Sequence, residues 1–170
     1  NKGQEEAIDL MSEFLKSSER VFLLEGKGGT GKTTIVKKVI EDLPRGTRII
    51  GIAPSHKAKK VLKKSFSDQL GRVETMTLAS ALAIRLKEST GKFEADIKKR
   101  KRGEFAMVNQ DTVFIIDETS MVSDKLFDEI SKFLDPSSKI IFMGDKAQLP
   151  PVGQDTDSKV FNIKKGYELI

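Results

Sequence analysis

Short, continuously apolar runs alternate along this chain with longer segments in which apolar residues recur every three or four positions. The apolar runs lie within residues 21–24, 49–53, 113–116 and 139–143. The segments with helical spacing lie within residues 4–16, 31–43, 55–66, 77–86 and 124–134. A strand that is apolar at nearly every position is buried on both faces, and helices usually cover such strands. The pattern therefore predicts an α/β fold, a parallel sheet with helices on both faces.

The helical segment after Pro54 is strongly basic. Ser55 precedes it and can accept a hydrogen bond from its first turn, as a helix N-cap does. We expect Val61, Leu62 and Phe66 to form its buried face. Its lysines form either a solvated face or a row of contacts to phosphate groups, and the sequence leaves both alternatives open.

Residues 87–110 interrupt the alternation. This segment is polar, and its five consecutive basic residues, Lys98–Arg102, stand between stretches that contain Phe93 and Phe105. We interpret it as a small inserted hairpin. The predicted organisation is one α/β domain made of residues 1–86 and 111–170, with residues 87–110 inserted. The basic run also fits a nuclear localisation pattern, although such runs are usually solvated.

Composition narrows the chemistry. The 170 residues include no cysteine, which excludes a disulfide scaffold, a cysteine-ligated zinc site and thiol catalysis. A single histidine, His56, argues against a histidine-built metal centre. No apolar run approaches the roughly 20 residues of a membrane span, and the polar N-terminus is not a signal peptide, so we expect no membrane association and a cytoplasmic protein. The net charge of +5 permits a polyanionic partner without proving one.

The strongest chemical signal is the sequence Gly-Lys-Gly-Gly-Thr-Gly-Lys-Thr at residues 26–33, between a predicted strand and a predicted helix. It matches the phosphate-binding loop (P-loop) pattern in the context that the pattern requires. Glycines let backbone N–H groups point into one concavity, and the next helix offers its N-terminus to an anion. Lys32 can reach the β- and γ-phosphates of ATP, and the Thr33 hydroxyl can bind Mg²⁺. The alternative is a chance glycine-rich turn. The expected nucleotide-binding residues of this loop are Gly26, Gly28, Gly29, Thr30, Gly31, Lys32 and Thr33.

Two further signals follow predicted strands, where parallel sheets place their ligand chemistry. Asp117 suits Mg²⁺ binding, directly or through water, and Glu118 suits polarisation of an attacking water molecule, which would indicate hydrolysis. The alternative for this pair is a helix cap. Gln148, in the segment 144–152, could contact the γ-phosphate or the water and so sense hydrolysis, whereas the alternative for its segment is a turn without a role.

In this order the pieces resemble the first RecA-like domain of a superfamily 1 DNA helicase, in the 5′→3′ branch that includes RecD and the phage helicase Dda. The matching segments are residues 26–34 for motif I, 52–58 for motif Ia, 117–121 for motif II and 144–152 for motif III. Gln-Leu-Pro-Pro at 148–151 is the most specific part. The resemblance covers essentially the whole chain and is weakest over residues 87–110.

The resemblance adds roles that the residues alone do not give. It implies a RecA-like P-loop NTPase fold, an adenine contact for Gln4 and a place for Thr34 in the nucleotide site. Contacts to single-stranded DNA are implied for Pro54, Ser55, His56 and Lys57. For His56 a plain exposed loop position is the equal alternative. Thr75 and Thr77 occupy the place of another DNA-contact motif, but the histidine typical of that motif is missing here.

The same resemblance implies a complete activity and its partners. ATP and Mg²⁺ would be the cofactors, and Lys32, Glu118 and Gln148 would be the catalytic residues. Single-stranded DNA and duplex junctions would be the partners, together with candidate replication or recombination proteins. The cell would be bacterial or phage-infected. Motifs IV to VI and a second RecA-like domain with an arginine finger are not in this sequence, so we expect it to be a fragment. The insertion resembles the small 1B domain with its strand-separating hairpin, although we expect Phe93 and Phe105 to pack the hairpin base.

Two other function classes stay open. A small P-loop kinase would share the phosphate-binding loop but would need an acceptor pocket and an arginine-bearing lid. A binding module that holds ATP without turnover would also share the loop. The intact set of Lys32, Thr33, Asp117 and Glu118 argues against a decayed site, and DNA-stimulated phosphate release separates the three classes.

Overall fold

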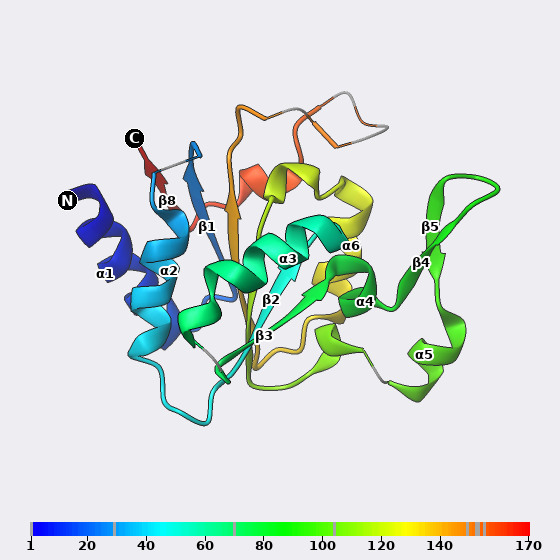
Figure 1. Ribbon diagram of the computed structural model, residues 1–170, viewed down its shortest axis with the longest axis horizontal. Coiled ribbons are helices and arrows are strands. Elements are labelled where there is room, and N and C mark those ends of the chain that lie inside the picture. The colour runs from blue at the N-terminus through cyan, green and yellow to red at the C-terminus, as the bar shows by residue number, and fades with distance from the viewer. Residues whose placement is uncertain are drawn as a thin grey trace.

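Six strands form one parallel sheet in the order β3-β2-β6-β7-β1-β8 (Figure 1). The computed structural model describes residues 2–28, 30–69, 71–103, 105–148, 150–151, 154 and 156–170. Gly29 of the P-loop, and Leu149 and Val152 of the 144–152 segment, lie outside the described residues. The strands of the sheet are β1 (Val21–Gly26), β2 (Arg48–Ala53), β3 (Val73–Thr77), β6 (Thr112–Ile116), β7 (Lys139–Gly144) and β8 (Gly166–Leu169).

Helices cover both faces of this sheet because its strands are apolar on both faces. On one face, Phe22, Leu24, Ile115 and Met143 join a core cluster with α1, α2 and α3. On the other, Leu23, Phe114 and Phe142 join a second cluster with α4 and α6. The helices are α1 (Lys2–Lys16), α2 (Lys32–Glu41), α3 (His56–Ser65), α4 (Leu78–Leu82), α5 (Ile97–Arg102) and α6 (Asp124–Phe133). The predicted α/β fold class is confirmed.

The four apolar runs all form central strands, but β3 was not predicted. Val73–Thr77 pairs in parallel with β2 at the edge of the sheet, in the register Gly51↔Thr75 and Ala53↔Thr77. An edge strand is half-exposed and tolerates polar residues, so its sequence lacks the continuous apolar signal of the central strands. Thr75 and Thr77, which occupy the place of a DNA-contact motif in the resemblance, therefore lie on a strand.

The helix expected over residues 77–86 is shorter than predicted. It ends at Leu82 because Ala83 adopts a left-handed backbone conformation (φ 51°), and Ile84–Lys87 then forms strand β4. In the basic helix α3, Ser55 is the N-cap as predicted and accepts a hydrogen bond from the Ala58 N–H at 3.1 Å. Leu62 and Phe66 are buried, but Val61 is 62% exposed, so its predicted place in the buried face is wrong.

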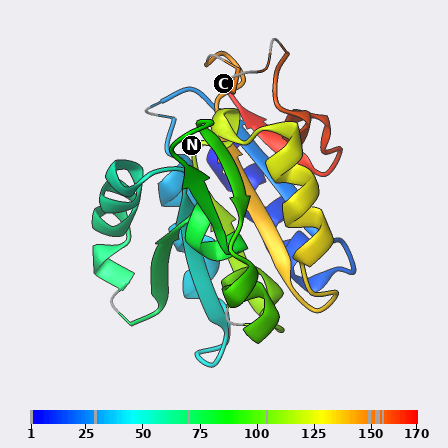
Figure 2. The ribbon, with the colours of Figure 1, turned by 90° about the vertical axis from the view of Figure 1, so that its right-hand side faces the viewer.

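The inserted segment projects away from the sheet as a two-stranded hairpin (Figures 1 and 2). Strand β4 (Ile84–Lys87) pairs with β5 (Lys92–Ala95) in antiparallel register, Leu86 opposite Phe93. The hairpin thus begins before residue 87, and the chain returns to the core through α5 and a short 3₁₀ helix, Ala106–Val108. Phe105 is buried in the core and packs edge-on against Phe133 at 5.1 Å. Phe93 is 43% exposed, so the packing role expected for the two phenylalanines holds for Phe105 alone.

Candidate nucleotide and nucleic-acid site

One edge of the sheet collects the candidate residues. The carboxyl ends of β1, β2, β6 and β7 lead directly into residues 26–33, 54–57, 117–118 and 144–148, respectively. In a parallel sheet these ends lie on the same side, which is where open α/β sheets bind ligands. The topology therefore brings together segments that are up to about 120 residues apart in sequence.

The P-loop ends in a helix N-terminus that is available to an anion. Gly31 precedes α2 with a left-handed backbone (φ 89°), and no side chain caps the helix there. The first N–H groups of an α-helix lack intrahelical partners, so such an end attracts phosphate. Thr30 closes the preceding turn, since its hydroxyl donates to the Lys27 carbonyl at 2.7 Å. Thr33 lies in the first turn of α2 beside the exposed Thr34, and Gly28 is exposed before it.

Gln4 of α1 reaches this loop directly. Its Nε2 donates to the Thr30 carbonyl at 3.2 Å and lies 2.5 Å from the position that a Cβ on Gly31 would take. Glycine is therefore favoured at residue 31 by its left-handed backbone, and a Cβ there would displace the Gln4 side chain. Gly26 is similarly close-packed, because a Cβ there would stand 2.6 Å from the Thr30 hydroxyl oxygen.

Lys32 folds back over its own loop. Its ammonium group donates to the carbonyl oxygens of Gly26 and Lys27, the latter at 3.1 Å. Burial raises the pKa of both Asp117 and Glu118, and the Lys32 charge opposes that rise, so the lysine lies within electrostatic reach of the acid pair. The P-loop and the end of β6 therefore form one charged site.

The acid pair is partly buried and its backbone is strained. Burial raises the pKa of Asp117, against the opposing effects of the Glu118 N–H, which donates to Asp117 at 2.9 Å, and of Lys32. Burial also raises the pKa of Glu118, and the neighbouring Asp117 carboxylate raises it further. Glu118 has φ 56° in the left-handed region, which is uncommon for a residue other than glycine. A carboxyl with a raised pKa and a fixed, unusual backbone has the properties of a general base or a water-orienting group.

The segment after Glu118 packs against the end of β7 through residues that sequence analysis did not single out. The Thr119 hydroxyl donates to the Met143 carbonyl at 2.7 Å and is fully buried. A Cβ on Gly144 would stand 2.7 Å from the Thr119 Cβ, so the close approach of these two segments requires glycine. The Thr-Ser sequence after the acid pair was the available signal, but its partner could be found only in three dimensions.

Gln148 lies in contact with the same segment. The Ser120 hydroxyl donates to the Gln148 side-chain oxygen at 2.8 Å, which joins the loop after β7 to the loop after β6. Farther along, Gln154 makes two hydrogen bonds with Asp124 at the start of α6, through its side-chain oxygen and nitrogen. A change at Gln148 therefore has a direct mechanical route to the acid pair.

The proposed DNA-contact residues are divided by the structure. Ser55, His56 and Lys57 are exposed, at the start of α3, beside the partly exposed Pro54. The Asp117 N–H donates to the Ile52 carbonyl at 2.9 Å, which places the acid pair beside the end of the strand that leads to Pro54. Thr75 instead lies within β3, and the buried Thr77 uses its hydroxyl to cap α4, accepting from the Ser80 N–H at 3.2 Å.

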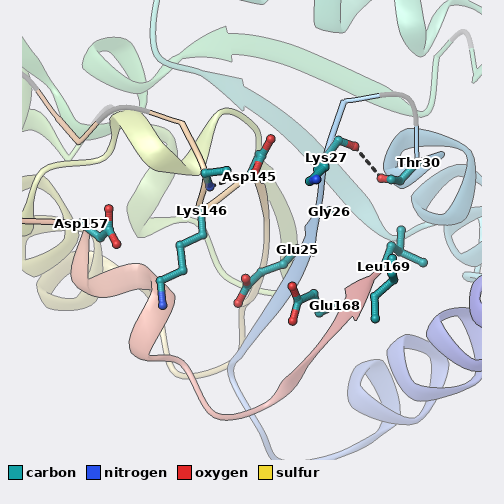
Figure 3. A pocket seen from close by; sticks show the side chains of 11 residues that line it. Glu25, Gly26, Lys27, Thr30, Asp145, Lys146, Asp157, Glu168 and Leu169 are labelled. Atoms are coloured by element: carbon teal, nitrogen blue, oxygen red, sulfur yellow. Dashed lines mark hydrogen bonds between the residues drawn. The ribbon is translucent and has the colours of Figure 1, made fainter.

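A cavity of about 480 Å³ opens beside the P-loop, between β1, β8 and the turn after β7 (Figure 3). The Glu25 and Glu168 side chains, paired in register on neighbouring parallel strands, lie side by side in its lining. Burial raises the pKa of Glu25, Glu168 raises it further, and Lys146 lowers it. The charged lining residues are Glu25, Asp145, Asp157, Glu168, Lys27 and Lys146. Four carboxylates against two ammonium groups disfavour a phosphate chain in this cavity, so it does not replace the P-loop as the anion site.

Metal binding at the site depends on few protein ligands. Within the described part of the chain, no three or more His, Cys, Asp or Glu side chains cluster as a metal site. Mg²⁺ commonly takes one or two protein ligands and completes its shell with phosphate oxygens and water. Thr33 and the partly buried Asp117 are oxygen donors of this kind at the same sheet edge. Among the described helices, none is both long and apolar enough to span a membrane.

Comparison with known proteins identifies the family. The sequence pattern of a family described as "AAA domain" matches residues 1–164. The chain belongs to this AAA domain family. It is 34% identical over 173 residues to the ATP-dependent DNA helicase dda of Enterobacteria phage T4, covering 98% of this chain and 37% of that protein. It is 30% identical to the RecBCD enzyme subunit RecD of Mycolicibacterium smegmatis, over 79% of this chain and 26% of that protein.

The fold of this AAA domain is also that of known helicases. A crystal structure of the Pif1 helicase from Bacteroides, in complex with ADP-AlF3 and single-stranded DNA, has a similar fold, with a TM-score of 0.56 and 24% identity. The match covers 91% of this chain and 35% of the Pif1 chain. The predicted resemblance to superfamily 1 helicases of the RecD and Dda type is confirmed, as is the RecA-like fold. The chain spans little more than a third of the length of the curated relatives that it matches almost from end to end.

Proposed function

We propose that this chain is the ATP-binding domain of a DNA helicase, in which ATP hydrolysis drives movement along single-stranded DNA and separation of duplex DNA, in the 5′→3′ direction. The observation that carries the proposal is the junction at one sheet edge. The Lys32 charge acts on the pKa values of Asp117 and Glu118, opposing their rise through burial, and Ser120, two residues after Glu118, is hydrogen-bonded to Gln148. Phosphate binding, water activation and a candidate nucleotide sensor are thus connected.

Each group at this edge has a role suited to its surroundings. The backbone of residues 26–31 and the N-terminus of α2 bind the phosphates, and Lys32 moves from its carbonyl partners onto the β- and γ-phosphates. Thr33 and Asp117 would hold Mg²⁺, which when bound neutralises charge on the phosphates. Glu118 orients the attacking water, since its raised pKa favours taking up a proton. Gln4 and Thr34 would complete the nucleotide site.

The DNA strand would cross the same edge over Pro54, Ser55, His56 and Lys57. These residues follow β2, whose Ile52 carbonyl is hydrogen-bonded to the Asp117 backbone, so the DNA contact and the acid pair share one support. The exposed lysines of α3 would add phosphate contacts and salt dependence. Thr75 and Thr77 are weaker candidates, because the Thr77 hydroxyl already caps α4.

The relatives support the remaining parts of the proposal. The phage relative is an ATP-dependent DNA helicase, RecD is a subunit of the RecBCD enzyme, and the Pif1 structure holds single-stranded DNA and ADP-AlF3. By resemblance, a second RecA-like domain of the same protein would close over the nucleotide and supply an arginine finger. The partners would be duplex junctions and replication or recombination proteins. The segment of residues 87–110, extended back to Ile84 where the hairpin begins, would act as the 1B-like insertion. The protein would be cytoplasmic.

The deciding experiment is phosphate release by the full-length protein with ATP and Mg²⁺, with and without single-stranded DNA. We expect strong stimulation by DNA, and we expect Lys32→Ala to abolish it while the protein stays folded, because Lys32 is the partly exposed first residue of α2 and its loss leaves no core cavity. Phosphate transfer to a small acceptor without DNA stimulation would favour a kinase. ATP binding with no turnover under either condition would favour the binding module.

A further inference from the structure

Within the basic run Lys98–Arg102, Arg100 differs from its lysine neighbours. Its side chain is 19% exposed, whereas Lys98, Lys99 and Lys101 are exposed. α5 spans less than two turns. Its residues differ in exposure, which shows that one side of the helix turns toward the core and the other toward solvent. Arg100 is the residue of this run that turns inward. A run that reads in sequence as a uniform charge patch therefore contains a residue with different surroundings.

Arg100 contacts two core helices at once. Its Nε and one terminal nitrogen donate to the Leu82 carbonyl, at 3.3 and 3.1 Å, which is the last carbonyl of α4. The same terminal nitrogen lies 3.3 Å from a Glu129 carboxylate oxygen on α6, and the guanidinium carbon lies 4.7 Å from the centre of the Phe133 ring. A planar guanidinium can make these contacts together, whereas a lysine ammonium on a single stem cannot reproduce the same fork.

The contacts of Arg100 fix the segment through which the hairpin returns to the core. The Asp96 N–H donates to the Ala83 carbonyl at 2.8 Å, so the two ends of the hairpin are tied to each other. Asp96 also caps α5, accepting from the Lys99 N–H at 3.2 Å. Phe105, after α5, packs against Phe133, the residue that Arg100 also covers. With Arg100 in place, the hairpin has a fixed base on α4 and α6.

The other end of α6 is attached to the loop after β7. Asp124, its first residue, accepts from Gln154 and from the Lys159 N–H, the latter at 2.9 Å. This loop also carries Gln148, which is bonded to Ser120. Ten residues of α-helix, about 15 Å, thus separate the nucleotide side of the domain from the hairpin side. A short helix with polar bonds near both ends provides a contiguous physical route between the two sides.

We propose that Arg100 is a positioning residue, which fixes the β4–β5 hairpin on α6 so that the hairpin moves with the ATPase core. The inference rests on the proposed function for its role in strand separation, but the positioning itself does not. The exposed lysines of α5 are not needed for it.

The test compares Arg100→Ala, Arg100→Lys and the matched control Lys101→Ala in the full-length protein. Lys101→Ala removes one charge from the same helix at an exposed position. The first measurement is hydrogen exchange of residues 84–95, without DNA or nucleotide. We expect faster exchange in the hairpin of Arg100→Ala and a smaller effect in Arg100→Lys, with the sheet and Lys101→Ala unchanged. Unchanged hairpin exchange in Arg100→Ala would overturn the proposal.

The second measurement separates positioning from charge. We expect Arg100→Ala to retain DNA-stimulated ATPase and to lose about tenfold in duplex unwinding rate, with Lys101→Ala near wild type in both. Equal losses in Arg100→Ala and Lys101→Ala would show a charge effect and contradict the proposal. If Arg100→Ala fails to fold, Glu129→Ala, which removes the partner, should give the same separation. Absence of DNA-stimulated ATPase in the unaltered protein would instead refute the proposed function and leave the exchange result standing.

Discussion

At the scale of single residues, Glu118 carries the clearest sign of function. A left-handed backbone at a residue other than glycine costs about 1–3 kcal/mol and persists where the surroundings over-determine it. Here the Glu118 N–H is bonded to Asp117, and the next residue, Thr119, is bonded to Met143. These bonds keep the strained backbone in place and the Glu118 carboxyl partly buried beside Asp117. This is an arrangement that favours catalysis over stability.

Glu118→Gln should therefore retain ATP binding and lose turnover. The substitution should also leave thermal stability unchanged or slightly higher at neutral pH, because the pKa of Glu118 is raised in the folded state. A carboxyl whose pKa is raised by folding stabilises the fold while it is protonated, and this contribution is lost as pH rises through the folded pKa. Nucleotide binding by calorimetry and phosphate release measure both effects. Loss of binding would show that Glu118 instead holds the metal or the loop.

Glu25 gives a pH-dependent prediction away from the reacting groups. Its pKa is raised by burial and by Glu168, its neighbour on β8. Protonated Glu25 therefore favours the fold at acid pH, and that contribution disappears as pH rises through its folded pKa. We expect Glu25→Gln to stabilise the protein at pH 7 by roughly 0.2–1 kcal/mol, the scale of a cross-strand pair. The gain should shrink below the unfolded pKa of glutamate, in thermal unfolding followed across pH. A gain that is the same at every pH would exclude the charge explanation.

At the scale of elements, the sequence predicts the continuously apolar strands and the P-loop, and it misses features that depend on the position of an element in the fold. The central strands were predictable because all their positions are apolar, and the P-loop because its pattern stands between a strand and a helix. β3 was missed because polar residues such as Glu74 and Thr75 are tolerated at a sheet edge. The helix predicted over residues 77–86 was too long, because nothing in the sequence marks the left-handed backbone of Ala83. The bond from Ser120 to Gln148 joins residues 28 apart and depends on the strand order, which local patterns do not contain.

Gly144 tests whether the contact between the β6 and β7 loops matters. Gly144→Ala would place a Cβ 2.7 Å from the Thr119 Cβ and 3.3 Å from its backbone nitrogen. Because Thr119 is fully buried, we expect a loss of about 1–3 kcal/mol in the free energy of unfolding, the usual cost of overpacking, together with slower ATP hydrolysis. Gly46→Ala is the matched control, since a Cβ there meets nothing within 4 Å. Equal stability of the two variants in urea unfolding would show that the loops can separate without penalty.

At the scale of the whole molecule, the hairpin stands outside the α/β core and presents apolar residues to solvent. Phe93 and Leu86 face each other across its strands and are 43% and 55% exposed. We expect Phe93→Ala to leave stability and DNA-stimulated ATPase near wild type, because no core contact is lost, and to slow the separation of duplex strands. Parallel measurements of ATPase and unwinding check this. A matched loss of both would indicate that the hairpin binds the single strand, and no change in either would make Phe93 dispensable.

The central claim is that hydrolysis at the P-loop drives strand separation. It is tested most directly by unwinding of a fluorescently labelled duplex with a 5′ single-stranded tail, using the full-length protein and its Glu118→Gln variant. We predict that the unaltered protein separates the strands with ATP and Mg²⁺ but not with a non-hydrolysable ATP analogue, and that Glu118→Gln binds the DNA without separating it. Equal strand separation with the analogue, or by the Glu118→Gln variant, would contradict it.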